Sequence, residues 1–267
     1  MAGRVAGKVA VVMGGGQTPG HTVGNGRAAA IVLGREGARV AVVDRDLASA
    51  EETVRLIRDA QGEAIALRAD ATREADVQGV IAAAVERFGD LDILHNNVGA
   101  SLALGDAGAT DLTEEAFDRS LAVNLKATWL TCKHALPALR EAHGSIVNIA
   151  SMAAINAYPL VGYKTTKAAV VALTENLAAH NAKYGVRANS ILPGLMNTPM
   201  AIESRVAAGT PREEVIASRD RRVPLGRRMG TGWDVANAAL FLHSEEAGFI
   251  TGVSLIVDGG ESVSWGS

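Results

Sequence analysis

The chain alternates short apolar runs with longer amphipathic segments, and this alternation restricts its fold more than any other feature of the sequence. Residues 9–13 form a fully apolar run bounded by turn residues, as expected of a strand buried on both faces. The other predicted strands are 38–44, 63–69, 91–95, 145–149, 186–192 and 254–257. The segments with helical spacing are 24–36, 47–60, 73–88, 113–142, 159–184 and 234–243.

Strands that alternate with helices of about ten or more residues are joined by right-handed crossovers, which give a parallel sheet covered on both faces. The sequence therefore predicts an α/β fold, a Rossmann-like doubly wound parallel sheet of about seven strands between two helical layers. We find no linker rich in Pro, Gly or Ser, so residues 1–267 are expected to form a single domain. The charged segment 199–231 interrupts the alternation and is predicted to be a helical insert.

The composition argues against several classes of function. The formal net charge of -3 provides no basic field for nucleic acid and no polybasic membrane anchor. No apolar run approaches the roughly 20 residues that span a bilayer. The single cysteine, Cys132, cannot form an internal disulfide, which indicates a reducing compartment. We therefore expect a cytoplasmic protein with neither a nucleic-acid partner nor a membrane segment, and we assign no metal site.

Tyr163 and Lys167 are candidates for proton transfer. They are four residues apart in a predicted helix and lie on one face of it. An ammonium beside a phenol favours the phenolate and is expected to lower the tyrosine pKa from its usual value of about 10. Such a phenol exchanges protons with an alcohol or a carbonyl near neutral pH. Taken alone, the pair also fits a solvated surface contact.

A second candidate site follows the first predicted strand, which runs into glycines and then into a helix. Gly14, Gly24 and Gly26 permit a tight turn and a close backbone approach, and the helix N-terminus attracts a pyrophosphate. Asp44 ends the second predicted strand near the roughly 20-residue offset of an acid that holds the adenosine ribose. A carboxylate there repels a 2'-phosphate, so the sequence favours NAD over NADP, although the adjacent Arg45 is able to bind that phosphate.

With these residues together, nearly the whole chain resembles the short-chain dehydrogenase/reductase family, in its ordinary-length Tyr-x-x-x-Lys form. That family usually reads Thr-Gly-x-x-x-Gly-x-Gly after its first strand, and Gly14, Gly24 and Gly26 match its glycines. Two departures stand out. Met13 replaces the usual Thr, and extra residues within 17–23 lengthen the glycine-rich loop.

The resemblance also implies further cofactor contacts. Asp70 and Ala71 correspond to the adenine pocket, whereas Asn97 and Gly99 belong to the family's Asn-Asn-Ala-Gly motif along the adenosine ribose. The loop expected to hold the nicotinamide carboxamide contains Pro193, Gly194, Met196 and Thr198. Tyr163 and Lys167 are expected to reach the cofactor as well.

The catalytic group implied by the resemblance consists of Asn124, Ser151, Tyr163 and Lys167. Ser151 would orient the substrate oxygen, and Asn124 would link Lys167 to solvent through water. The expected function is an NAD-dependent oxidoreductase that interconverts a secondary alcohol and a ketone, with Tyr163 as general acid or base. The alternatives are an NADP-dependent ketone or 3-oxoacyl reductase, and a non-catalytic nucleotide-binding sensor or scaffold.

The substrate end of the sequence is less informative. Residues 101–104 and 152–161 are mainly apolar or small, which suits an uncharged alcohol. The insert 199–231 is rich in arginine, and a solvated helix face is the preferred interpretation, with attraction to a carboxylate or to CoA phosphates as the alternative. His21 is interpreted as an exposed loop residue or as a phosphate contact. The family's long helices form subunit interfaces, so the resemblance implies a homotetramer or homodimer.

Overall fold

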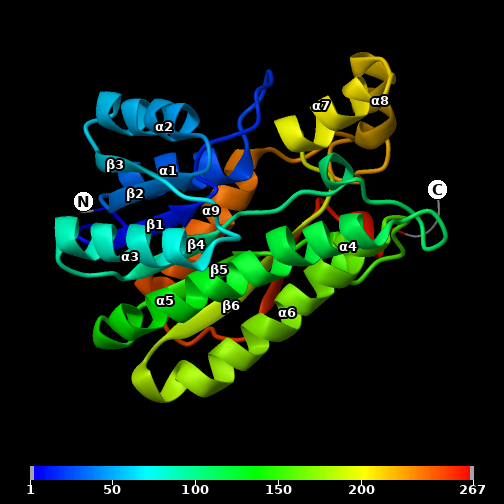
Figure 1. Ribbon diagram of the computed structural model, residues 1–267. Helices are drawn as coiled ribbons and strands as arrows, with labels where there is room; N and C mark the ends of the chain where they lie inside the picture. Colours follow the sequence, from blue (N-terminus) through cyan, green and yellow to red (C-terminus); the bar gives the residue numbers. More distant parts are fainter. Residues whose placement is uncertain (1–2, 265–267) are drawn as a thin grey trace.

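The computed structural model describes residues 3–264 and contains one seven-stranded sheet in which all neighbouring strands are parallel. The strand order is β3-β2-β1-β4-β5-β6-β7 (Figure 1). The strands are β1 Val9–Met13, β2 Arg39–Asp44, β3 Glu63–Arg68, β4 Ile93–Asn96, β5 Ser145–Ile149, β6 Arg187–Pro193 and β7 Ser254–Val257. The predicted doubly wound α/β fold is confirmed.

Helices cover both faces of this sheet (Figure 1). One layer contains α3 Glu74–Phe88, α5 Ala127–Glu141 and α6 Val161–Asn181, and the other contains α1 Asn25–Arg35, α2 Leu47–Asp59 and α9 Gly232–His243. The remaining α-helices are α4 Glu114–Ser120, α7 Pro199–Ala207 and α8 Arg212–Asp220. Within residues 3–264, no helix combines the length and apolar character needed to cross a membrane.

The first strand shows why an uninterrupted apolar run suits this position. All five residues of β1 are buried, and successive side chains point to opposite faces of the sheet. Val9, Val11 and Met13 join the core beneath α3, α5 and α6. Ala10 and Val12 join the core beneath α1, α2 and α9. Since both faces are covered, a polar residue at any of these five positions would be buried.

Two predicted helical segments are more complex than their sequence patterns indicate. The predicted helix 113–142 consists of α4, a π-helical turn at Leu121–Lys126 and α5. The predicted insert forms α7 and α8, which lie beside each other at one end of the sheet (Figure 1). The π-helical turn carries Asn124, in agreement with the frequent occurrence of such turns at functional sites.

Two buried histidines meet in the interior between β4 and α9. The ring centroids of His95 and His243 are 5.7 Å apart, and both side chains are fully buried. His243 shares a hydrogen bond of 2.9 Å with Ser145 through Nδ1, whereas both ring nitrogens of His95 lack a partner within the described chain. Burial lowers the pKa of His95 to about 4 and holds the pKa of His243 well below its usual range.

This pair is expected to make the protein acid-sensitive. The unfolded chain binds protons on both histidines below about pH 6.5, whereas the folded chain keeps His95 neutral down to about pH 4. The free energy of unfolding should therefore fall by about 1.4 kcal/mol per pH unit for each histidine in this window. The free energy of unfolding, measured in urea, should fall between pH 7 and pH 5 in both proteins. In His95→Leu this fall should be about 2 kcal/mol smaller than in the wild type. The exposed His180→Gln is the control, and equal losses in His95→Leu and wild type would contradict the prediction.

Candidate active site

The candidate active site lies where the carboxyl ends of the central strands meet. β1 pairs with β2 on one side and with β4 on the other, so the order of the strands reverses at β1. Ligands of doubly wound sheets bind in the crevice outside such a reversal. The segments after β1, β4, β5 and β6 contain most of the predicted site residues.

Tyr163 and Lys167 lie together on α6 and point into the molecule. Tyr163 is 9% exposed and Lys167 is 3% exposed, which excludes the solvated surface pair. The Lys167 ammonium lies 5.8 Å from the centroid of the Tyr163 ring and donates a hydrogen bond of 2.7 Å to the Ile149 carbonyl. A Cβ atom at Gly99 would lie 2.9 Å from Lys167 Nζ, so glycine leaves room for the ammonium.

The predicted lowering of the Tyr163 pKa is wrong for this structure. Burial raises the pKa of Tyr163 to about 12, hydrogen bonding with Ser151 opposes that change, and Tyr158 reinforces it. Burial also lowers the pKa of Lys167 to about 8. Removal of both groups from water disfavours both charged forms. In the protein without cofactor or substrate, the Tyr163 phenol is therefore protonated at neutral pH.

Ser151 directly follows β5 and begins a short 3-10 helix, Met152–Ala154. Its side-chain oxygen accepts a hydrogen bond of 3.1 Å from the Ala153 backbone N–H, which fixes the orientation of the hydroxyl. The same hydroxyl interacts with the Tyr163 phenol. The structure therefore brings Ser151 and Tyr163 together, as the sequence predicts.

Asn124 is fully buried in the π-helical turn, and its side chain binds the backbone of Ala100. Its Oδ1 accepts a hydrogen bond of 2.9 Å from the Ala100 N–H, and its Nδ2 donates one of 3.0 Å to the Ala100 carbonyl. Asn124 Oδ1 would lie 3.1 Å from a Cβ atom at Gly99. Asn124 is thus a buried amide that fastens the loop after β4 beside Lys167.

Sequence reasoning missed Asp106, whose carboxylate holds the start of the helix that carries Tyr163. Asp106 is 6% exposed and accepts hydrogen bonds from the backbone N–H groups of Gly162 at 2.8 Å and Tyr163 at 2.6 Å. The N-cap residue of α6 is Leu160, which has no side-chain acceptor. Asp106 therefore supplies the cap from a distant loop and positions Tyr163 through its backbone.

A buried polar network forms the floor beneath these residues. Asn96 Nδ2 donates to Asn148 Oδ1 at 2.8 Å, and Asn96 Oδ1 accepts from the Thr131 hydroxyl at 2.7 Å. Asn148 Nδ2 donates to the Thr174 hydroxyl at 2.9 Å, and Cys132 Sγ lies against both asparagines. The network links β4, β5, α5 and α6, so it fixes the ends of β4 and β5 relative to α6, which carries Tyr163 and Lys167.

The glycine-rich loop after β1 is packed against the start of α1. Gly14 has a φ of +72°, which favours glycine. A Cβ atom at Gly26 would lie 2.0 Å from the Gly14 carbonyl oxygen and 2.6 Å from Asn97 Nδ2, so no larger residue fits there. Gly24 is the N-cap of α1 and provides no side-chain cap, which leaves the first N–H groups of this helix available to an anion.

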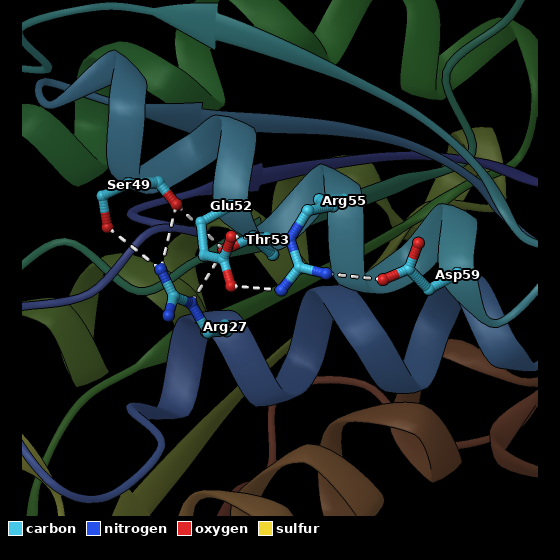
Figure 2. Close-up of polar contacts among 6 residues, drawn as sticks. All are labelled: Arg27, Ser49, Glu52, Thr53, Arg55 and Asp59. Carbon is cyan, nitrogen blue, oxygen red and sulfur yellow. Dashed lines mark hydrogen bonds and ion pairs between the residues drawn. The ribbon is translucent and has the colours of Figure 1, made fainter.

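The side chains of Arg27, Ser49 and Thr53 hold this loop, although no sequence pattern selects them; Figure 2 shows the contacts that join these three residues. Arg27 Nε donates to the Thr53 hydroxyl at 2.9 Å, and the Arg27 Nη2 donates to the Ser49 carbonyl at 3.0 Å. The Thr53 hydroxyl donates to the Gly15 carbonyl at 2.9 Å, while the Gln17 N–H donates to the Ser49 hydroxyl at 2.8 Å. These bonds join the loop to α1 and α2.

The predicted adenosine contacts follow β2 and β3. Asp44 ends β2, and its carboxylate accepts from the Gly16 N–H at 3.0 Å and the Asp46 N–H at 3.1 Å. Asp70 lies two residues beyond the end of β3 and accepts hydrogen bonds from the Thr72 hydroxyl and N–H at 2.7 and 2.9 Å. Its hydrogen bond with the Thr72 hydroxyl lowers the Asp70 pKa, so this side chain is an anion. Ala71, the next residue, is buried.

The predicted nicotinamide loop begins at the end of β6 and leads into the insert. Pro193 ends β6, and the Gly194 N–H donates to the Val257 carbonyl at 3.0 Å. Met196 forms an isolated parallel bridge with Gly230. Thr198 is the buried N-cap of α7, but its side chain makes no capping hydrogen bond. Its hydroxyl is therefore not used by the helix that it precedes.

The lengthened part of the glycine-rich loop contacts the insert. Gln17 closes this segment, because its Oε1 accepts from the Gly24 N–H at 3.1 Å and its Nε2 donates to the Thr22 carbonyl at 3.3 Å. A Cβ atom at Gly20 would lie 2.8 Å from Glu203 Oε1 on α7. His21 is exposed and interacts with Glu203, which supports its interpretation as an exposed loop residue.

Comparison with known proteins places the chain among oxidoreductases. Residues 21–262 match the family model described as Enoyl-(Acyl carrier protein) reductase. The chain is 40% identical to 2,5-dichloro-2,5-cyclohexadiene-1,4-diol dehydrogenase LinX of Sphingobium indicum, covering 98% of this chain and 99% of the relative. It is 38% identical to 2-(R)-hydroxypropyl-CoM dehydrogenase of Xanthobacter autotrophicus, covering 90% and 95%.

Solved structures agree with these relatives. A crystal structure from Burkholderia xenovorans, assigned to the short-chain dehydrogenases/reductases, has a TM-score of 0.93 at 42% identity, covering 99% of this chain and 100% of that one. Carveol dehydrogenase from Mycobacterium avium, in complex with NAD, has a TM-score of 0.89 at 27% identity, covering 98% and 100%. The named relatives favour an enzyme over a non-catalytic sensor or scaffold. The chain belongs to the short-chain dehydrogenase/reductase family and is an alcohol dehydrogenase of that family.

Proposed function

We propose that this protein interconverts a secondary alcohol and a ketone with NAD as the hydride acceptor or donor, and that residues 1–267 act as one nucleotide-binding domain. The observation that carries the proposal is the meeting of Ser151, Tyr163 and Lys167 at the carboxyl end of β5. A hydroxyl, a phenol and an ammonium in one buried place are the groups that proton transfer to or from an alcohol oxygen requires.

Each residue then has a defined role. Ser151 orients the substrate oxygen, and Tyr163 exchanges a proton with it. In the reducing direction Tyr163 starts as the neutral phenol, which its raised pKa favours. Lys167 supplies positive charge next to the phenol and would bind the nicotinamide ribose, while Asn124 holds the loop at Ala100. When bound, the oxidised cofactor accepts the hydride, and its positive charge favours the phenolate.

The chain fits such a cofactor. The uncapped N-terminus of α1 faces the glycine-rich loop, and Asn25 in its first turn has a buried Oδ1 without a partner among the described residues. The free N–H groups suit binding of the pyrophosphate, whereas the Asn25 oxygen is an acceptor and suits a hydrogen-bond donor such as a ribose hydroxyl. We assign the adenosine end to Asp44, Asp70, Ala71 and Asn97, and the nicotinamide end to Gly99, Pro193, Gly194, Met196 and Thr198.

The choice between NAD and NADP depends on two opposing groups of side chains. The Asp44 carboxylate at the end of β2 favours ribose hydroxyls and repels a 2'-phosphate. A surface depression of about 740 Å³ is lined by Arg45, Arg68 and Arg73, together with Asp70. These arginines favour the alternative, an NADP-dependent ketone or 3-oxoacyl reductase. We propose NAD, because Asp44 is directly beside the glycine-rich loop.

A substrate panel tests this function. Reduced-nicotinamide absorbance is followed with secondary alcohols and ketones, with NAD and NADP in parallel. The relatives' names indicate a cyclic diol and a hydroxypropyl thioether of CoM as first members of the panel. We expect turnover with NAD to exceed turnover with NADP. Turnover with NADP alone would support the alternative cofactor, and no turnover of any alcohol or ketone would contradict the proposal.

We further propose that the protein is a homotetramer, with a homodimer as the alternative. α5 exposes Trp129, which is 45% exposed and lines a shallow apolar hollow with Leu121, Leu125 and Leu173. On the edge strand β7, Ile256 is 41% exposed. Light scattering at micromolar concentration is expected to give the tetramer mass, and Trp129→Glu should shift it to a smaller species because it places a charge on this face. A wild-type monomer would contradict the proposal.

A further inference from the structure

One arginine of the insert is buried without a carboxylate partner. Arg219 on α8 is 9% exposed, and within residues 3–264 no carboxylate lies within ion-pair distance of it. Its Nε donates to Met229 Sδ at 3.2 Å, and its Nη2 reaches the Met196 carbonyl at 3.5 Å. These are weak acceptors for a buried guanidinium. A buried charge with such partners is costly unless a ligand completes its environment.

The surroundings of Arg219 add positive charge. Arg205 on α7 lies close enough to repel it, and Arg205 also has no ion-pair partner among the described residues; its Nη1 donates to the Ala201 carbonyl at 2.6 Å. The carboxylate of Glu203 is bound by Arg212 through both of its oxygens. Two unneutralised guanidinium groups therefore remain on the inner part of the insert.

The other nearby acids are also occupied. Asp220 Oδ1 accepts from the Met229 N–H at 2.7 Å. Glu261, whose charge does reach Arg219, is bound by Arg222 at 2.7 Å. Arg219 thus keeps donor capacity that no acid of the described chain uses.

Arg219 lies next to the catalytic group. Its Nη2 contacts Met196, in the loop after β6 that we assign to the nicotinamide. Its charge also reaches the Tyr158 phenol, whose ring centroid is 5.8 Å from that of Tyr163. An anion held by Arg219 would therefore belong to a molecule that reaches Tyr163.

We infer that Arg219, assisted by Arg205, forms an anion subsite and that the substrate is an alcohol or ketone bearing a carboxylate or sulfonate group. This inference rests on the proposed function, because it places the acidic group relative to Tyr163. The sequence pattern favours a solvated helix face for the arginines of the insert. For Arg205 and Arg219 the inference replaces that interpretation with the alternative, attraction to an acidic group. The exposed arginines of the segment, such as Arg228, still fit a solvated face. Hydrogen bonds between a guanidinium and an anion are short and roughly twice as strong as neutral ones.

The test compares substrates that differ only in charge. Levulinate, its primary amide and the sulfonate with the same ketone skeleton are reduced with saturating NADH, as are homologues with longer chains. The wild type should prefer at least one acid over its amide by about tenfold to hundredfold in kcat/KM. The carboxylate and sulfonate arms identify which acid the subsite accepts.

Variants of the insert then test whether Arg219 causes the preference for the acid over the amide. In Arg219→Met the ratio of kcat/KM for acid and amide should fall to about one, and Arg219→Lys should restore part of it because it retains the charge. Arg228→Met, in the same segment, should keep the wild-type ratio. A wild-type ratio near one at every chain length, or a ratio that Arg219→Met does not change, would overturn the inference. Weaker NADH binding in Arg219→Met with an unchanged ratio would also overturn it, because Arg219 would then serve the cofactor.

Measurements of ligand binding test the anion subsite independently of the proposed function. If the substrate panel shows no turnover, the proposed function fails, yet calorimetry with the NADH complex still compares levulinate with levulinamide. Tighter binding of levulinate to the wild type than to Arg219→Met would support the anion subsite by itself. Equal binding of acid and amide would contradict it.

Discussion

Replacing Tyr163 with phenylalanine is expected to lower kcat by about 10²–10⁴-fold, which is the usual contribution of a positioned acid or base. The ring stays in its buried place on α6, and only the hydroxyl near Ser151 is lost. NADH affinity should change by no more than a few-fold, because the glycine-rich loop and Asp44 are unaffected. Stopped-flow turnover and fluorescence titration with NADH measure the two quantities.

The matched control is Tyr184→Phe, which removes the same hydroxyl from an exposed tyrosine. It should retain wild-type kcat. Wild-type turnover in Tyr163→Phe would remove Tyr163 from the mechanism and leave Ser151 as the group to examine. Loss of NADH binding in that variant would instead show that the substitution disturbs the fold around α6.

Replacing Asp106 with alanine should damage both stability and turnover, although Asp106 is not predicted to touch the substrate. The substitution leaves the buried N–H groups of Gly162 and Tyr163 without their acceptor. The expected loss in the free energy of unfolding is about 2–4 kcal/mol. The start of α6 also loses its anchor, so kcat should fall while the substrate KM changes less.

Asp111→Ala, an exposed acid on the same connecting segment, is the control and should behave as wild type. Asp106→Asn keeps the size of the side chain and one acceptor oxygen, so it should restore part of the stability and part of the turnover. Urea unfolding and steady-state kinetics at one pH distinguish the two effects. If Asp106→Ala lost stability while turnover per folded molecule stayed unchanged, Asp106 would be a helix cap without influence on Tyr163.

The fold could be predicted because its main determinant is local. Residues 9–13 must be buried on both faces, and that requirement is visible as an unbroken apolar run. Tyr163 and Lys167 could be paired because they lie four residues apart on one predicted helix, whereas Ser151 joined them only through the family resemblance. Local spacing therefore suffices to group residues that lie on one helix or strand.

Contacts between distant segments were not visible in this way. Asp106 precedes Tyr163 by 57 residues, and a lone aspartate in a loop has no pattern that indicates which helix it caps. Arg27 reaches Thr53 on a separate helix (Figure 2). A helix start at Leu160 without a capping side chain is the one available signal, since it indicates that a cap must come from elsewhere.

The direction of the Tyr163 pKa could not be obtained from spacing either. A separation of four residues places Lys167 on the same side of the helix as Tyr163, but it does not reveal how much water remains around them. In the structure both groups are buried, and the ammonium is directed at the Ile149 carbonyl. Solvent exclusion depends on the packing of several elements and therefore outweighs the pairwise attraction that the sequence suggested.

The single cysteine lies in the buried polar network below the site, and its labelling rate measures how often this part of the fold opens. Cys132 is fully buried, and burial raises the pKa of its thiol to about 12. Alkylating reagents and oxidants attack the thiolate, so the folded molecule offers them neither access nor the reactive form. The rate at which Cys132 is labelled therefore records how often α5 separates from the strand ends. Because the chain has no other thiol, this reading needs no engineered probe.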